Sequence, residues 1–125
     1  MRKVLFLLMS CAALLAFNAV QAHGNTKPLH GGVMQTVGEM SFELVAGADG
    51  TELYVVDDGE DITSADMTAK LTIVNGGASS EATMQPAGGN KFEAKGVKLP
   101  SGAKVAVLLT AKDQVSKVRA NFTMK

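Results

Sequence analysis

The chain has 125 residues, and its 12 Lys plus Arg are balanced by 12 Asp plus Glu. This length suits one compact domain, and the balanced charge argues against electrostatic binding to nucleic acid, which needs a clustered basic surface. The single cysteine, Cys11, lies near the amino terminus, so the rest of the chain has no disulfide, no thiolate nucleophile and no cysteine-based metal site.

Residues 1–22 have the pattern of a cleaved secretory signal peptide. Arg2 and Lys3 form a charged start, an almost wholly apolar stretch follows, and Val20-Gln21-Ala22 provides small residues at the cleavage positions. Cleavage would leave residues 23–125 with a net charge of −2 and no second apolar run long enough to span a membrane. We therefore expect an exported, periplasmic protein. Lipid attachment at Cys11 is the less favoured alternative, because it would leave an apolar stretch on the mature terminus.

Residues 23–31 are polar and contain Pro28 and several glycines, which predicts a flexible arm before the folded domain. From residue 32 to residue 125 the apolar residues recur with period two, the pattern of strands with one buried face. The residues predicted to face the core are Phe42, Leu44, Leu53, Val55, Leu71, Ile73, Ala82, Met84, Phe92, Ala94, Val105, Val107, Leu109, Val118, Ala120, Phe122 and Met124.

Glycine-rich turns separate these runs, and no window has a convincing helical stripe. We therefore predict an all-β domain over residues 32–125. Its expected architecture is a single antiparallel β-sandwich or small barrel of seven to eight short strands, about the size of an immunoglobulin domain. The acidic segment 57–68 lacks the aspartate spacing of a calcium loop, so a solvated loop is the favoured interpretation.

Both histidines, His23 and His30, lie in the predicted arm, and cleavage after Ala22 would make His23 the first mature residue. A free amino terminus and the imidazole of the same residue can chelate one metal ion, and a second imidazole could complete three nitrogen ligands. Such a ligand set suits copper, with other soft or borderline cations as alternatives. The alternative is that two exposed histidines in a mobile arm bind nothing specific.

Met34 and Met40 are further candidate ligands, because thioether sulfur selects Cu(I) where thiols would be oxidised. A three-residue loop at Thr36-Val37-Gly38 would place these two methionines opposite each other across a hairpin. The same register puts Met40 on the face of Phe42, so two core methionines are the competing interpretation.

Catalysis has little support in this sequence. A hydrolytic triad needs a rigidly held histidine, and both histidines lie in the predicted arm. An amino-terminal histidine with a second one also occurs in the copper site of polysaccharide monooxygenases, but those enzymes present a flat aromatic surface. Here only Tyr54 remains outside the predicted signal and core positions, so we expect no enzymatic activity.

The stretch Lys27-Pro28-Leu29-His30-Gly31-Gly32-Val33-Met34 and the hairpin after it resemble a known bacterial pattern. They are similar to the small periplasmic His-Gly-Gly β-domains associated with adaptor subunits of heavy-metal efflux pumps. The resemblance implies a β-rich domain that handles copper, silver or related cations for such a pump. It identifies His30 as the family residue, whereas His23, Met34 and Met40 are suggested by ligand chemistry alone. Asp58 departs from the pattern, where a histidine is expected.

These observations predict a periplasmic copper-binding accessory or carrier domain of a metal efflux or resistance system. Its expected metal residues are His30, His23, Met34 and Met40, and its expected partner is an efflux adaptor or another periplasmic metal protein. The alternative is an exported β module without metal that functions in protein–protein contact.

Overall fold

The structure is a computed structural model that describes residues 27–125. The predicted signal peptide and His23 lie outside these residues. In the described part, antiparallel strands are the main secondary structure, and the prediction of an all-β domain is confirmed. No helix among the described residues is long and apolar enough to cross a membrane.

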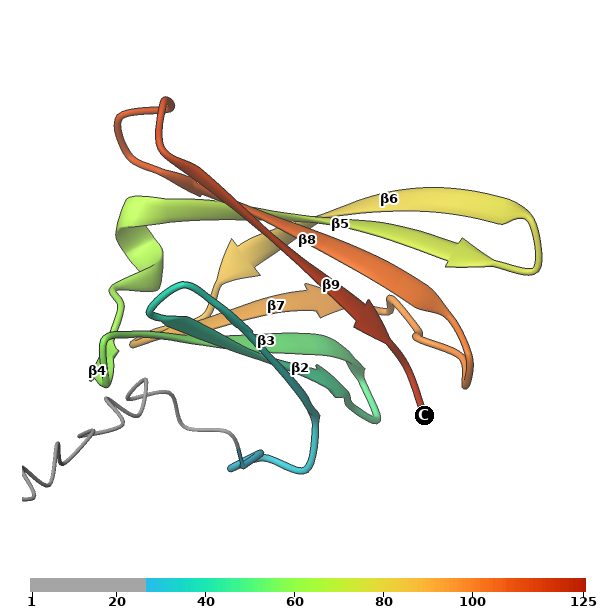
Figure 1. Cartoon of the computed structure of the whole chain (residues 1–125). Helices are drawn as coiled ribbons and strands as arrows, with labels where there is room; N and C mark the ends of the chain where they lie inside the picture. Colours follow the sequence, from blue (N-terminus) through green and yellow to red (C-terminus); the bar gives the residue numbers. More distant parts are fainter. Residues whose placement is uncertain (1–26) are drawn as a thin grey trace, which may run out of the picture.

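Nine strands and one short 3-10 helix make up the described residues (Figure 1). They are β1 (Val33–Val37), β2 (Met40–Ala46), β3 (Gly50–Asp57), β4 (Glu60–Asp61), η1 (Ser64–Asp66), β5 (Met67–Asn75), β6 (Ala78–Pro86), β7 (Lys91–Lys95), β8 (Lys104–Ala111) and β9 (Lys117–Thr123).

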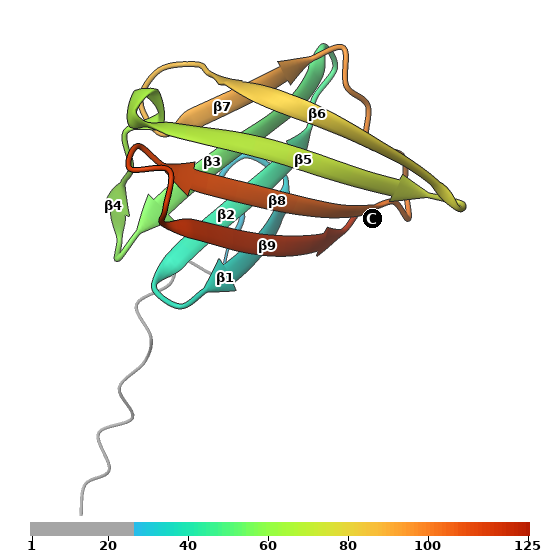
Figure 2. The ribbon, with the colours of Figure 1, turned by 90° about the horizontal axis from the view of Figure 1, so that it is seen from above.

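The strands form one antiparallel sheet in the order β1-β2-β3-β7-β6-β5-β8-β9, with β4 paired to β3. The sheet curls until its two end strands, β1 and β9, lie side by side (Figure 2). Among the described strands, β1 is hydrogen-bonded only to β2, and β9 only to β8. The result is a small barrel that is nearly closed, with an open seam between β1 and β9.

The alternating apolar residues meet inside this barrel. Phe42, Leu44, Leu53 and Phe92 are fully buried, and the core extends through β5, β8 and β9 to Phe122. Nearly all residues predicted to face the core are buried there, while Ala82 and Val118 are partly buried against it. The period-two pattern therefore predicted the buried face of the strands correctly, because strand side chains alternate between the two faces of a sheet.

The first hairpin has a different register from the one expected. Val37 pairs with Met40, which leaves a two-residue turn at Gly38-Glu39 instead of a three-residue loop. Gly38 has a φ of +60°, as a tight hairpin turn requires, and such turns match the twist of the flanking strands. The expectation that Met34 faces Met40 is thus wrong: Met34 is paired with Glu43.

The acidic segment 57–68 holds more structure than a solvated loop. Asp58 and Gly59 form a tight turn that returns the chain as β4 along β3, and η1 follows. Met67, which the sequence placed in this loop, begins β5 and packs partly against the core.

Truncating the core should be costly. Leu53 is fully buried at the centre of β3, so we expect Leu53→Ala to lower the free energy of unfolding by about 2–5 kcal/mol through lost contacts and a cavity. Urea denaturation measures this loss. The matched control is Leu29→Ala, because Leu29 is 70% exposed and its truncation should cost less than about 0.5 kcal/mol. Equal losses in the two variants would contradict the assignment of the core.

Candidate functional site

The carboxylate of Glu43 lies beneath the segment that leads into β1. The period-two pattern places Glu43 on the outer face of β2, yet only 3% of this residue is exposed. Its Oε1 accepts a hydrogen bond from the backbone N–H of Leu29 at 3.0 Å, and its Oε2 accepts from those of His30 at 2.8 Å and Gly32 at 2.9 Å. Residues 29–32, which include the end of the predicted arm, are therefore hydrogen-bonded to the outer face of the barrel.

The two glycines after His30 allow this close approach. Gly31 has a φ of +75°, a conformation that side chains disfavour. Gly32 lies so close to β2 that a Cβ would sit 2.4 Å from the carbonyl oxygen of Leu44 and 2.8 Å from Cγ2 of Val45. The His-Gly-Gly sequence thus has a local structural reason: it turns the chain and presses it against β2.

His30 is held by two further contacts. Its Nδ1 lies 2.9 Å from Oε1 of Glu43, and its ring stacks on that of Tyr54 with a centroid separation of 3.6 Å and an interplanar angle of 2°. An ionised carboxylate only accepts hydrogen bonds, so Nδ1 carries the proton in this contact. In the neutral imidazole, Nε2 then keeps its lone pair. A carboxylate that accepts a hydrogen bond from the other ring nitrogen is typical of histidines that bind metals.

Tyr54 is positioned by charged neighbours on β3 and β7. Its hydroxyl donates to Oε2 of Glu52 at 3.1 Å, and Nζ of Lys91 lies 3.3 Å from Oε1 of Glu52 and 5.9 Å from the Tyr54 ring centroid. Partial burial and the hydrogen bond to Glu52 raise the pKa of Tyr54, which keeps the phenol protonated. The ring is therefore a neutral, oriented platform for His30.

Met34 lies on the same face as these groups. Met34 is paired with Glu43 and Glu43 with Tyr54, so the three form a row across β1, β2 and β3. A pocket of about 270 Å³ lies over this row. Its lining residues are Leu29, His30, Met34, Ser41, Glu43, Tyr54, Val56, Asp61 and Asn90. One imidazole and one thioether therefore share a small cavity.

Met40 lies elsewhere. It occupies the core face of β2 with Phe42 and Leu44 and packs partly against the core. Because neighbouring strand positions point to opposite faces, this register separates Met40 from His30 and Met34. Of the four predicted ligands, the fold brings His30 and Met34 together, excludes Met40 from their pocket, and leaves His23 outside the described residues.

The ligand set among the described residues is small. No group of three or more His, Cys, Asp or Glu side chains in residues 27–125 could hold a metal ion. All four acceptor positions of Glu43 are used by hydrogen bonds. Asp61, which also lines the pocket, accepts a 3.4 Å hydrogen bond from Asn90. The described part of the site thus offers one imidazole nitrogen, one sulfur and the carboxylate of Asp61.

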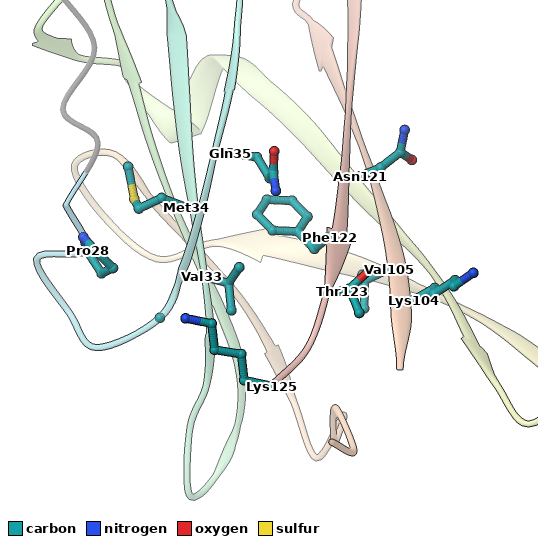
Figure 3. Close-up of a pocket in the computed structure, with 11 residues that line it drawn as sticks. Pro28, Val33, Met34, Gln35, Lys104, Val105, Asn121, Phe122, Thr123 and Lys125 are labelled. Atoms are coloured by element: carbon teal, nitrogen blue, oxygen red, sulfur yellow. The ribbon is translucent and has the colours of Figure 1, made fainter. Parts of the chain in front are cut away.

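A larger cavity of about 720 Å³ follows the seam between β1 and β9. Figure 3 shows Gln35, Phe122 and Lys125 along it, with Met34 on the other side of β1 from Val33 and Gln35. Its lining has no histidine and no carboxylate side chain. It is therefore a poorer candidate for metal chemistry than the pocket over His30.

Sequence reasoning identified His30 and Met34 but missed the role of Glu43. Alternation with Phe42 and Leu44 places Glu43 on the outer face, where a charged side chain is ordinarily exposed. Only the return of residues 29–32 across β2 buries it, and no local signal reveals that path. Tyr54 was recognised as the aromatic residue left outside the core, without a partner.

Comparisons with known protein families, with curated proteins and with solved structures find no match for this chain. The resemblance to efflux-associated His-Gly-Gly domains therefore remains a prediction.

Stability should depend on the charge of Glu43. Burial raises the pKa of Glu43, but the hydrogen bonds from His30, Gly32 and Leu29 together hold it below its ordinary value of 4.5. A lowered carboxyl pKa stabilises the fold above the unfolded pKa, and this contribution is lost as pH falls through the folded pKa. We expect Glu43→Gln to lower the free energy of unfolding at pH 7 by about 1–3 kcal/mol.

Below the folded pKa the wild type also loses the charge, so the difference between wild type and Glu43→Gln should shrink as pH is lowered beneath 4.5. Urea denaturation across this pH range measures it. The control is Glu60→Gln, at an exposed position on β4. A difference from wild type that is independent of pH would contradict the role given to the Glu43 charge.

Proposed function

We propose that this protein is an exported, non-catalytic carrier or accessory domain that binds a copper-type cation, in its reduced form, at His30 and Met34. The observation that carries the proposal is the 2.9 Å contact between Nδ1 of His30 and Glu43, which leaves Nε2 as the ligand atom. Met34 lines the same pocket as His30, so a thioether sulfur is available as a second donor.

The donor types favour Cu(I) over harder ions. Thioether sulfur is a soft ligand that suits Cu(I), and imidazole binds copper readily. Harder divalent ions prefer several carboxylate and carbonyl oxygens, but the Glu43 carboxylate is already saturated with hydrogen bonds and Asp61 is the only other carboxylate that lines the pocket. Silver and other soft cations share this preference. His23 remains the proposed third ligand.

The site also suits exchange of its cargo. The His30 side chain is 41% exposed, so an ion on Nε2 would be within reach of another protein. Few ligands and partial exposure favour release, which a carrier needs more than tight retention. Transfer to an efflux adaptor or another periplasmic metal protein is the role that the His-Gly-Gly resemblance suggests.

Replacing Met34 should weaken Cu(I) binding selectively. We expect Met34→Leu to reduce Cu(I) affinity by about tenfold or more and to leave weak Zn(II) binding unchanged, because only the soft ligand is removed. Competition with a colorimetric Cu(I) chelator, on protein purified from the periplasm with its natural terminus, measures this affinity. Met40→Leu is the matched control, because it makes the same change in the same hairpin on the core face.

Histidine variants separate the contributions of the two imidazoles. We expect His30→Ala to lose most Cu(I) binding, and His23→Ala to reduce it further only if the mature chain begins near that residue. Unchanged affinity in both His30→Ala and Met34→Leu would reject the site. Absence of Cu(I) binding by the wild type would favour the metal-free interaction module.

A further inference from the structure

One strand of the barrel has a long free edge. β6 pairs with β5 from Ala78 to Met84, but with β7 only at Gln85 and Pro86. Toward the Gly76-Gly77 turn, β6 diverges from β7 (Figures 1 and 2). Within residues 27–125, no strand is paired to the outer edge of the stretch 78–84, although Thr83 lines a pocket together with Glu93, Ala94 and Lys95 of β7. We call this stretch the β6 edge.

The register shows which backbone groups are free. The hairpin has a two-residue turn, so its closing pair, Asn75 and Ala78, is hydrogen-bonded. Beyond this pair, non-hydrogen-bonded and hydrogen-bonded pairs alternate along the two strands. Ser79, Glu81 and Thr83 consequently occupy pairs that are not hydrogen-bonded to β5. Their N–H and C=O groups point away from β5, toward the β6 edge.

The β6 edge lacks the usual protection against strand addition. Natural edge strands are commonly blocked by lysine, proline, a bulge or a covering segment. The stretch 78–84 contains no lysine or proline, and its pairing with β5 is continuous. Its single charge, Glu81, forms a 2.9 Å ion pair with Lys70 on β5. Residues 78–81 are all exposed.

We propose that the β6 edge pairs antiparallel with the β6 edge of a second copy of this chain, across a twofold axis at Ser80. Outward N–H and C=O groups recognise an extended backbone, and an isologous contact requires a surface that complements itself. With the axis at Ser80, Ser79 forms hydrogen-bonded pairs with Glu81 of the second copy, and Ala78 faces Ala82.

Other axes along the same edge are disfavoured. An axis at Glu81 would place two carboxylates directly opposite each other, which is repulsive. An axis at Ala82 would bring Gln85 and Pro86 into the new ladder, although both already pair with β7. The Ser80 axis avoids both conflicts and places only small side chains at its centre. An axis at Ser79 would also avoid them, but it would pair only residues 78–80 of the two strands, whereas the Ser80 axis pairs residues 78–82.

The contact is short, so we expect a weak dimer that forms as concentration rises. Stable interfaces usually bury at least about 1,200 Å², more than one short strand pair provides. The β6 edge holds none of the residues that line the pocket over His30. A test that rejects self-association therefore leaves the Cu(I) proposal standing, and a test that rejects Cu(I) binding leaves the dimer proposal standing.

Cysteine cross-linking tests the register. In the proposed dimer the two Ser80 residues form a non-hydrogen-bonded pair with Cα atoms about 4.5 Å apart, which a disulfide can bridge. We expect Ser80→Cys in the mature protein to give a covalent dimer under mild oxidation. The matched control is Thr83→Cys, also exposed, whose two copies would lie about 20 Å apart and should stay monomeric.

Proline substitution tests the backbone contact without a cross-link. Ser79→Pro removes an outward N–H that β5 does not use, and proline is tolerated at such edge positions. Sedimentation analysis should show weaker association for Ser79→Pro than for Ser79→Ala, which keeps the N–H. Equal cross-linking of both cysteine variants, or a wild type that stays monomeric at about 1 mM, would overturn the proposal.

Discussion

The buried carboxylate of Glu43 is the interaction on which the candidate site depends. It accepts hydrogen bonds from the backbone N–H groups of Leu29, His30 and Gly32 and from the His30 ring. Burying a carboxylate is costly unless it is hydrogen-bonded, and here every acceptor position is used. The Glu43 side chain therefore sets the path of residues 29–32 and the orientation of the His30 imidazole. It also leaves Nε2 as the ring nitrogen with a free lone pair.

The barrel supports this arrangement by keeping the first three strands rigid. β2 and β3 share an unbroken ladder, and their inner faces carry Phe42, Leu44, Leu53 and Val55. A core of this kind holds the outer face in a fixed register, so Glu43 and Tyr54 stay adjacent beneath His30. Where the sheet is not fully paired, at the seam and at the β6 edge, the fold instead leaves backbone groups free for other contacts.

The fold was predictable because each buried strand carries a local signal. Phe42 and Leu44, or Val105 and Val107, alternate with polar residues, and glycine-rich turns divide the runs. The site was predictable only in part. Ligand chemistry and the His-Gly-Gly resemblance both point to His30, and ligand chemistry alone points to Met34, but the expected hairpin loop wrongly places Met40 opposite Met34. A change of one residue in the expected loop length altered the cross-strand partner, since register depends on the turn that forms.

The sequence by itself determined the strand faces, the membership of the core and the residue types able to bind a soft metal. These properties follow from local periodicity and side-chain chemistry. Only the tertiary structure decided that Glu43 is buried, that His30 stacks on Tyr54, and that Met34 shares their pocket while Met40 does not. Those facts depend on contacts across β1, β2 and β3, and a pattern read along one strand carries no information about its neighbours.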